Sequence, residues 1–268
     1  MKIGKETIPR TAISSSNAET IVVRGKNLSR DLIGKISFTD YFHLLVTGRP
    51  ATPAATAILN ATLVAIAEHG LVPSVQASRM TLAAAPDALQ GAVAAGILGC
   101  GSVILGASEA AGRLFCEVQQ RTKGGACYTA AATEIVAEYR AAKRAVPGYG
   151  HPLHKERDAR VDALFDVAKE VGIDLTYVRI AEAIERVIPD TLGKTLMLNV
   201  SAAIPAVLLA AGFPLRALKG VPILARTAGL IGHLTEEFEM PIGFALSYQA
   251  VREIQYIGDI PAGFAPND

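Results

Sequence analysis

The sequence VPGYGHPLHKERDAR, from Val146 to Arg160, is the segment on which the interpretation of this chain depends. A proline and two glycines let its backbone approach a ligand closely and adopt angles that other residues resist. His151 follows directly, and its imidazole can change charge near neutral pH. Lys155, Arg157 and Arg160 offer cations for carboxylates or phosphates. These local features fit a ligand-binding loop and, equally well, a surface turn before a basic helix start.

Helix start and stop signals recur on both sides of this segment. Ser37 opens a capping pattern that ends at Gly48, and Thr52-Pro53 opens a helix that ends near Gly70. Further helices are predicted over 129–144, over 161–170, from Asp174 to before Pro189, from Leu192 through a kink at Pro205, and from Pro222 towards Glu239. The single β-branched run is Thr20 to Arg24, so the sequence predicts an all-α fold.

Composition excludes several classes of function. Half of the 268 residues are apolar, aromatic residues are few and Trp is absent, which suits closely packed helices. The 26 basic and 25 acidic residues predict neither a nucleic-acid nor a membrane-surface partner. Three cysteines without a CxxC pair favour a reducing, cytoplasmic location. The first residues also lack the apolar run of a secretory signal.

Two stretches could suggest other sites. The segment 88–108 carries no charge and is long enough to cross a bilayer, but its five glycines predict a buried core helix followed by an irregular turn. The stretch HPLHKERD holds two histidines and two acidic residues without a known metal-ligand spacing. We therefore expect neither a membrane span nor a metal site.

Several landmarks in order resemble the citrate synthase-like superfamily. PGYGH is followed by Asp158 and Arg160 at the family's offsets, and Arg24-Gly25 with SFTDYFHLLVTGRPAT resembles its N-terminal passage. Glu68-His69 falls where the family has an Asp-His pair, and Ala225-Arg226-Thr227 resembles its arginine-bearing helix. The resemblance covers roughly residues 20–250, and the length is similar to that of citryl-CoA lyases and the lyase module of ATP-citrate lyase.

The resemblance implies a two-lobed helical fold. Residues 107–212 would form a small lobe carrying the active-site loop, and residues 1–106 with 213–268 would form the large lobe. It also implies a homodimer or a higher even homo-oligomer built through apolar helices, with the helix over 89–105 as a candidate interface.

The resemblance also implies roles for single residues. The backbone of the loop would cradle the adenine end of coenzyme A, and Lys155 would meet one of its phosphates; the loop residues are Val146, Pro147, Gly148, Tyr149 and Gly150. His69, His151, Arg160 and Arg226 would surround a dicarboxylate, with the arginines pairing its carboxylates. His151 would hydrogen-bond the oxygen on the carbon whose bond is made or broken. Coenzyme A enters as part of the substrate, and no permanently bound cofactor is implied.

Two departures from the family set the direction of the reaction. The synthases have a histidine in GPAHGGANEA, and the matching GSVILGASEA has Ile104 there. They have an aspartate in NVDAH, where this chain has Ser201 after Asn199-Val200. We expect Ser201 to be one of the substrate-binding residues. Condensation requires removal of a very weakly acidic thioester proton, which neither replacement can perform at neutral pH. We therefore expect cleavage of citryl-CoA, or of a related 3-hydroxyacyl-CoA, to acetyl-CoA and oxaloacetate or a related 2-oxoacid.

Three alternatives stay open at this stage. The chain could be a condensing enzyme of the citrate synthase type, or a non-catalytic protein that binds CoA esters. It could also be a lyase for a different acyl-CoA, because the arginine that synthases lend from a partner subunit has no counterpart in FEMPIGF, residues 238–244.

Overall fold

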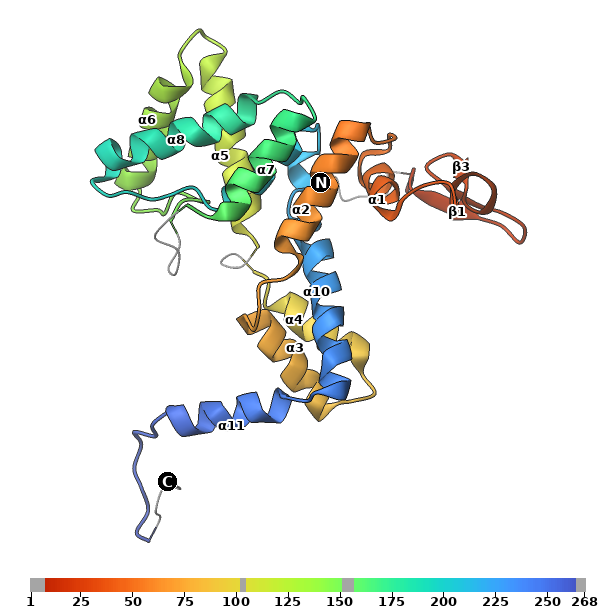
Figure 1. The fold of residues 1–268 in the computed structure, drawn as a ribbon, viewed down its shortest axis with the longest axis vertical. Helices are drawn as coiled ribbons and strands as arrows, with labels where there is room; N and C mark the ends of the chain where they lie inside the picture. The colour runs from red at the N-terminus through yellow and green to blue at the C-terminus, as the bar shows by residue number, and fades with distance from the viewer. Residues whose placement is uncertain (1–7, 102–104, 151–156, 264–268) are drawn as a thin grey trace. The chain divides into compact units, whose positions relative to one another are not determined.

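The computed structural model describes residues 8–101, 105–150 and 157–263, and Figure 1 shows a mostly helical chain. Three short strands come first: β1 (Ser14–Ser16), β2 (Ile21–Val23) and β3 (Lys26–Asn27), followed by the single π-turn η1 (Leu28–Leu32). The helices are α1 (Phe38–Thr47), α2 (Pro53–Ala67), α3 (Pro73–Ala84), α4 (Leu89–Leu98), α5 (Ala107–Thr122), α6 (Tyr128–Ala141), α7 (Ala159–Glu170), α8 (Thr176–Leu192), α9 (Val200–Ala210), the 3₁₀ turn η2 (Leu215–Ala217), α10 (Gly220–Glu239) and α11 (Gly243–Glu253). The predicted helical class is confirmed.

Contacts divide the chain into two compact units. The first contains Met1–Glu68 and Gly101–Ala225, and the second contains His69–Cys100 and Arg226–Asp268. These boundaries differ from those of the predicted lobes, 107–212 and the remainder, and the lobe division stays a prediction. The unit boundary falls within the sequence of α10.

The N-terminal part of the first unit is a small antiparallel sheet beside α1. The strand order is β1-β2-β3, with Ser15 opposite Val22 and Val22 opposite Asn27. The predicted strand over 20–24 corresponds to β2. Ser37 caps α1 by accepting a hydrogen bond from the amide of Asp40, and Gly48 ends it in the left-handed conformation, as predicted.

Helices α2, α5, α6, α7, α8 and α9 form the helical body of the first unit. The apolar helix α9 lies at its centre and contacts α2, α5, α7 and α8, so all residues from Ala202 to Leu208 are buried. Helix α8 is strongly amphipathic and buries Ile180, Ile184 and Ile188 completely. In Figure 1 these helices form one group. Burial of α9 on all sides fixes its N-terminus, which matters for the site below.

Two predicted helix boundaries are wrong. Helix α8 continues through Pro189 to Leu192 and ends at Gly193, because a proline in the last turns removes only one backbone donor while neighbouring apolar residues stay buried. The following helix does not start near Leu192. It starts at Val200, where the Asn199 side chain accepts a hydrogen bond from the amide of Ser201.

The second unit contains α3, α4, α11 and most of α10. Leu82, Ala92 and Leu234 form its core, and the Ser78 hydroxyl donates to the Ala92 carbonyl at 2.7 Å.

Helices α3, α5 and α11 are not among those predicted from the sequence. The predicted helix over 89–105 ends earlier, at Leu98. Ala92 of α4 belongs to the core of this unit, whereas Leu98 is 86% exposed, so the expected core helix is buried on one face only. None of the described helices combines the length and hydropathy that crossing a bilayer requires.

A buried ion pair holds α3 to the junction of α10 and α11. The Arg79 guanidinium donates to the carboxylate of Glu237, to that of Glu236 at 2.6 Å and to the Met240 carbonyl at 2.9 Å. Glu237 also accepts from the amides of Ile242 and Gly243, the latter at 2.7 Å. Burial alone would raise the pKa of Glu237, but Arg79 and these amides outweigh it and lower that pKa.

Removing this buried charge should destabilise the second unit. Glu237→Gln leaves Arg79 buried without its main partner and is expected to lower the free energy of unfolding by about 3–5 kcal/mol in urea titrations. Glu236→Gln is the matched control, since the Glu236 side chain is 47% exposed and should contribute at most about 1 kcal/mol. Equal losses in the two variants would contradict this interpretation.

Candidate active site

The loop from Val146 to Gly150 is paired with the segment that leads into α9. The Gly150 amide donates to the Met197 carbonyl at 2.8 Å, and the Asn199 amide donates to the Gly148 carbonyl at 3.0 Å. The Asn199 side chain donates to the Gly150 carbonyl at 2.7 Å. Gly148 (φ 87°) and Gly150 (φ 80°) both have left-handed backbones, which favour glycine. The predicted ligand loop is thus held in one conformation against the start of α9.

The side chains of this loop are directed into the protein. Val146 and Tyr149 are buried, and the Tyr149 hydroxyl donates to the Ala181 carbonyl of α8 at 2.8 Å. Burial raises the pKa of Tyr149 well above its usual range, and nearby Glu185 adds to the effect. Tyr149 is therefore an anchor, and any contact of the loop with a ligand would involve its backbone.

Asp158 joins three parts of this region. It is the N-cap of α7, where it accepts from the Arg160 amide at 3.1 Å, and it accepts from Arg160 Nε at 2.9 Å and Nη2 at 2.7 Å. Its second oxygen also lies 3.4 Å from the amide of Val200, the first residue of α9. Burial would raise the pKa of Asp158, but these donors lower it. Sequence reasoning missed this residue as part of the site, although an aspartate directly before a helical pattern is an N-cap signal.

Arg160 keeps part of its donor capacity. A guanidinium has five N–H groups. Asp158 accepts from the one on Nε and from one of the two on Nη2. Nη1 lies 3.5 Å from the Ala65 carbonyl at the end of α2. Within the described ranges these are the partners of its terminal nitrogens, which leaves N–H groups on Nη1 and Nη2 that can receive one carboxylate as a fork. The side chain is 24% exposed, so this predicted substrate-binding residue is accessible.

Arg157 is the other cation of the segment 146–160 that the structure describes, and its ion pairs stabilise the fold. It forms ion pairs with Asp162 at 3.0 Å and with Glu185 at 3.3 Å. Glu185 in turn accepts from the amide of Leu198 at 2.6 Å, next to the paired loop. Arg157 thus supports the loop from α8 and is a poor candidate for binding an anion.

Ser201 lies where the segments already described meet. It is the second residue of α9 and half-buried, between Val200, whose amide lies near Asp158, and Ala202, which contacts Gly148. The first unit therefore brings together four predicted or newly found elements: the loop 146–150, Asp158, Arg160 and Ser201.

Arg226 and His69 belong to the second unit. Arg226 is 3% exposed on α10, and its Nε and Nη1 find no hydrogen-bond partner among the described residues. A buried guanidinium in this state is unfavourable unless an anion approaches it. His69 is exposed, directly after Glu68 at the end of α2. The predicted convergence of these two residues with Arg160 stays a prediction.

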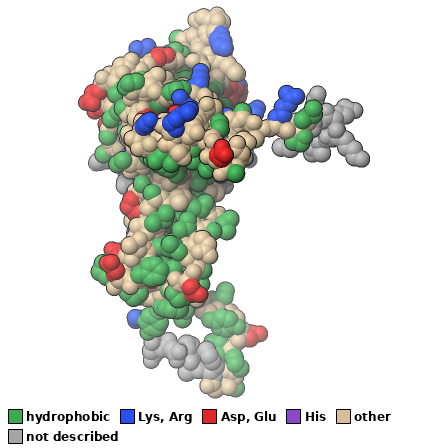
Figure 2. Space-filling view, turned by 90° about the vertical axis from the view of Figure 1, so that its right-hand side faces the viewer, with side chains coloured by type: hydrophobic (Ala, Val, Ile, Leu, Met, Phe, Trp, Pro, Cys, Tyr) green, Lys and Arg blue, Asp and Glu red, His purple; other side chains and the backbone are tan. Residues whose placement is uncertain are grey.

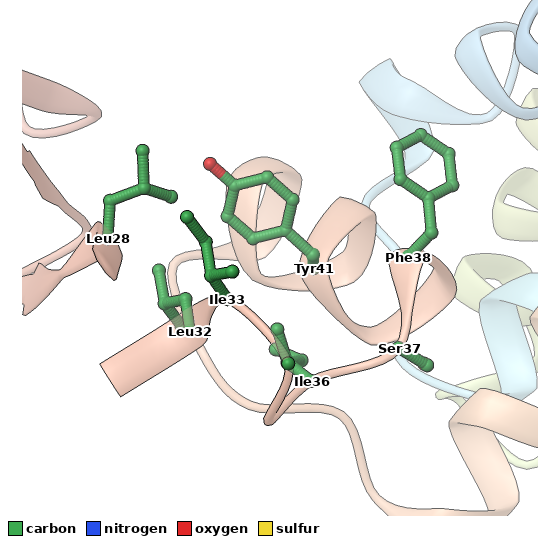
Figure 3. A pocket seen from close by; sticks show the side chains of 8 residues that line it. Leu28, Leu32, Ile33, Ile36, Ser37, Phe38 and Tyr41 are labelled. Atoms are coloured by element: carbon green, nitrogen blue, oxygen red, sulfur yellow. The ribbon is translucent and has the colours of Figure 1, made fainter. Parts of the chain in front are cut away.

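Three predicted residues lie outside the described ranges: His151, Lys155 and Ile104. Among the described residues, no group of three His, Cys, Asp or Glu side chains could hold a metal ion. Figure 3 shows a hollow of about 220 Å³ between η1 and α1, lined by Leu28, Leu32, Ile33, Gly34, Ile36, Ser37, Phe38 and Tyr41. It is almost entirely apolar and contains none of the predicted site residues, so it offers no chemistry for catalysis.

Comparison with known proteins gives a consistent result. The family description "Citrate synthase, C-terminal domain" matches residues 8–242. The solved citryl-CoA lyase from Hydrogenobacter thermophilus is 32% identical, with a TM-score of 0.83 over 97% of this chain and 98% of that one. No curated protein sequence matches the chain.

Two more distant structures share the fold. A Methanosaeta concilii ATP citrate lyase, solved with (3S)-citryl-CoA, has a TM-score of 0.76 at 24% identity, over 97% of this chain and 43% of that one. The citrate synthase from Thermotoga maritima has a TM-score of 0.64 at 22% identity, over 86% of this chain and 60% of that one. The fold expected from the sequence is confirmed.

Gly148→Ala should disrupt the loop. A Cβ at this position would lie 2.5 Å from the Ala202 Cβ and 3.0 Å from the Ala202 backbone nitrogen. The control is Gly125→Ala, where φ is 94° and nothing lies within 4 Å of the added carbon. Backbone strain should cost about 1–2 kcal/mol in both variants, and the clash should add about 1–3 kcal/mol only at Gly148. Urea unfolding measures both, and equal losses would refute the close packing of loop and helix.

Proposed function

The chain belongs to the citrate synthase family, and on that premise we propose that it cleaves citryl-CoA, or a closely related 3-hydroxyacyl-CoA, to acetyl-CoA and oxaloacetate or a related 2-oxoacid. The observation that carries the proposal is Ser201 at the N-terminus of α9. In the synthase motif an aspartate occupies this position. The described part of the site thus has a hydroxyl where condensation needs a carboxylate base.

The cleavage reaction makes smaller demands on the protein. A base removes the proton of the C3 hydroxyl, the carbon–carbon bond breaks, and its electron pair forms the enolate of acetyl-CoA. Water then protonates the enolate, and the former C3 becomes the carbonyl carbon of the 2-oxoacid. His151 and His69 are the proposed bases, since imidazole can accept a proton near neutral pH. The hydroxyl of Ser201 is not required to ionise in any of these steps.

Two arginines are proposed to bind the carboxylates of the substrate. Arg160 has one open edge, which suits one carboxylate, and the buried Arg226 has two nitrogens without a partner among the described residues. Each can neutralise a carboxylate through charge-assisted hydrogen bonds. The need for an anion at Arg226 supports a substrate with at least one carboxylate besides the thioester.

Coenzyme A is assigned to the glycine loop. The backbone of residues 146–150 is held rigidly by its hydrogen bonds to residues 197 and 199, and this main chain is proposed to contact the adenine end of the ligand. Lys155 is proposed to meet a phosphate of the same ligand. In this reading coenzyme A arrives and leaves with the substrate, and no resident cofactor is involved.

One coupled assay tests the reaction. With citryl-CoA as substrate and malate dehydrogenase as the reporter, the protein is expected to release oxaloacetate, and with acetyl-CoA and oxaloacetate it should release no free thiol. Arg226→Gln should lower kcat/KM by about 10- to 150-fold, through loss of charged hydrogen bonds. Arg113→Gln is the control, because Arg113 is 61% exposed and its ion pair is with Glu109 on the same helix.

Other outcomes of this assay select the alternatives. Absence of oxaloacetate release, together with micromolar binding of citryl-CoA, would replace the lyase by a non-catalytic CoA-ester protein. Thiol release from acetyl-CoA and oxaloacetate would indicate a condensing enzyme. Oxaloacetate release that survives His151→Ala unchanged would remove the proposed role of that histidine.

A second copy of the chain is the proposed partner of the second unit. Eight large apolar residues between Phe238 and Ile257 are each more than half exposed: Phe238, Met240, Phe244, Tyr248, Val251, Ile254, Tyr256 and Ile257. Figure 2 shows hydrophobic side chains gathered over this unit. Their area is on the order of the ~800 Å² that each partner buries in a standard interface. Monomers rarely expose such a surface, and the uncharged α4 adds to it.

A charge within this surface should therefore weaken the homodimer. Val251→Asp is expected to raise the dimer dissociation constant at least tenfold, because a carboxylate would be buried against apolar side chains. Light scattering after size-exclusion chromatography measures the mass. Val64→Asp, at a valine of α2 that is 80% exposed, is the control and should not change the mass. A monomeric wild-type protein at micromolar concentration would contradict the proposal.

A further inference from the structure

We propose that Asp158 is a positioning residue, which orients the guanidinium of Arg160 so that a single edge faces the substrate. The inference rests on the proposed function in one respect, because it takes Arg160 to bind a substrate carboxylate. It goes beyond that function by assigning a role to Asp158, which the resemblance gives only as a landmark of the motif and which the chemistry of cleavage does not require.

The two oxygens of Asp158 have separate partners. Oδ1 accepts from the Arg160 amide and from Arg160 Nε, which ties the side chain to the first turn of its own helix. Oδ2 accepts from Arg160 Nη2 and lies 3.4 Å from the Val200 amide. The N-termini of α7 and α9 and one guanidinium therefore meet on one carboxylate. A movement of the Arg160 guanidinium would break its two hydrogen bonds with a carboxylate that contacts the N-termini of both helices.

The environment of Asp158 explains why the charge is needed. The side chain is 8% exposed, and its surroundings within the first unit supply a cation and two helix N-termini, all of which favour an anion. A carboxylate in this state accepts hydrogen bonds and does not take part as a proton acceptor. Asp158 is consequently no substitute for the missing catalytic aspartate.

A simple helix cap is the competing explanation. An N-cap needs one oxygen that accepts from the amide two residues later, and Asn performs this function about as well as Asp. The bidentate contact with Nε and Nη2 is different, because it requires both oxygens of a carboxylate. Asp158→Asn therefore separates the two roles: it keeps the cap and removes the fork that orients Arg160.

The first experiment compares kinetic constants for citryl-CoA. Asp158→Asn should raise KM about tenfold or more with a smaller change in kcat, and it should leave the affinity for free coenzyme A unchanged. Asp174→Asn is the matched control: Asp174 is exposed and accepts from the Thr176 amide at 3.0 Å before α8, without an arginine. Equal KM values in the Asp158→Asn and wild-type proteins would overturn the proposal.

A double variant tests whether Asp158 acts through Arg160. If it does, Asp158→Asn should not lower kcat/KM further in an Arg160→Gln background, since the group to be oriented is already absent. If the double variant instead loses kcat/KM by the product of the two single-variant factors, Asp158 has an independent, structural role and the proposal is overturned. Arg160→Lys keeps the charge but cannot form the fork, so it should raise KM as Asp158→Asn does. A normal KM for Arg160→Lys would overturn the proposal even if Asp158→Asn does not fold.

A spectroscopic measurement separates this inference from the proposed function. The Nε–H of Arg160 should exchange slowly with water in ¹⁵N NMR spectra of the wild type and rapidly in Asp158→Asn, with Arg160→Gln identifying the signal. Unchanged exchange would overturn the positioning role in an active lyase. If the wild-type protein cleaves no citryl-CoA, the proposed function fails, and the exchange rate still decides whether Asp158 holds Arg160.

Discussion

The pairing of the loop 146–150 with the segment 197–199 is the constraint on which the geometry of the first unit's site depends. It fixes a glycine-rich backbone against the N-terminus of the buried helix α9 through main-chain hydrogen bonds, which are insensitive to side-chain changes. Asn199 contributes twice, since its side chain caps α9 and donates to Gly150. The close contact of Gly148 with Ala202 leaves no space for a side chain. Loop and helix therefore form one rigid support for whatever binds there.

The charged residues of the two units, each taken by itself, fall into two kinds. Asp158, Arg157 and Glu185 have partners inside the protein, so their charges are compensated before any ligand arrives. Arg226 is buried with two nitrogens that have no hydrogen-bond partner in the described part of the chain. Structural charges are normally paired, and an uncompensated buried cation is the exception that indicates a ligand. Under the proposed function, this contrast would separate residues that support the site from a residue that binds the substrate.

Local signals in the sequence predicted the parts of the fold that are locally determined. The N-caps Ser37 and Thr52 placed α1 and α2 correctly, because capping depends on residues three positions apart. Asp158 also lies 3.4 Å from an amide 42 positions away in α9, and no local pattern reveals this contact. The uncharged segment over α4 predicts both a core helix and a candidate interface, because hydropathy indicates that a surface must be covered without specifying whether the same chain or a second copy covers it.

The absence of a carboxylate at position 201 bears on both directions of the proposed reaction. By microscopic reversibility, a site that lacks a base for forming the enolate also lacks the corresponding acid for protonating it. Water would then protonate the enolate in cleavage, and hydroxide would remove the thioester α-proton in condensation. These are the same step taken in opposite directions, so the missing group slows both by the same factor, and the net direction is set by the equilibrium and the concentrations. The N-terminus of α9 would favour a carboxylate at this point, so the fold itself does not exclude an aspartate at position 201.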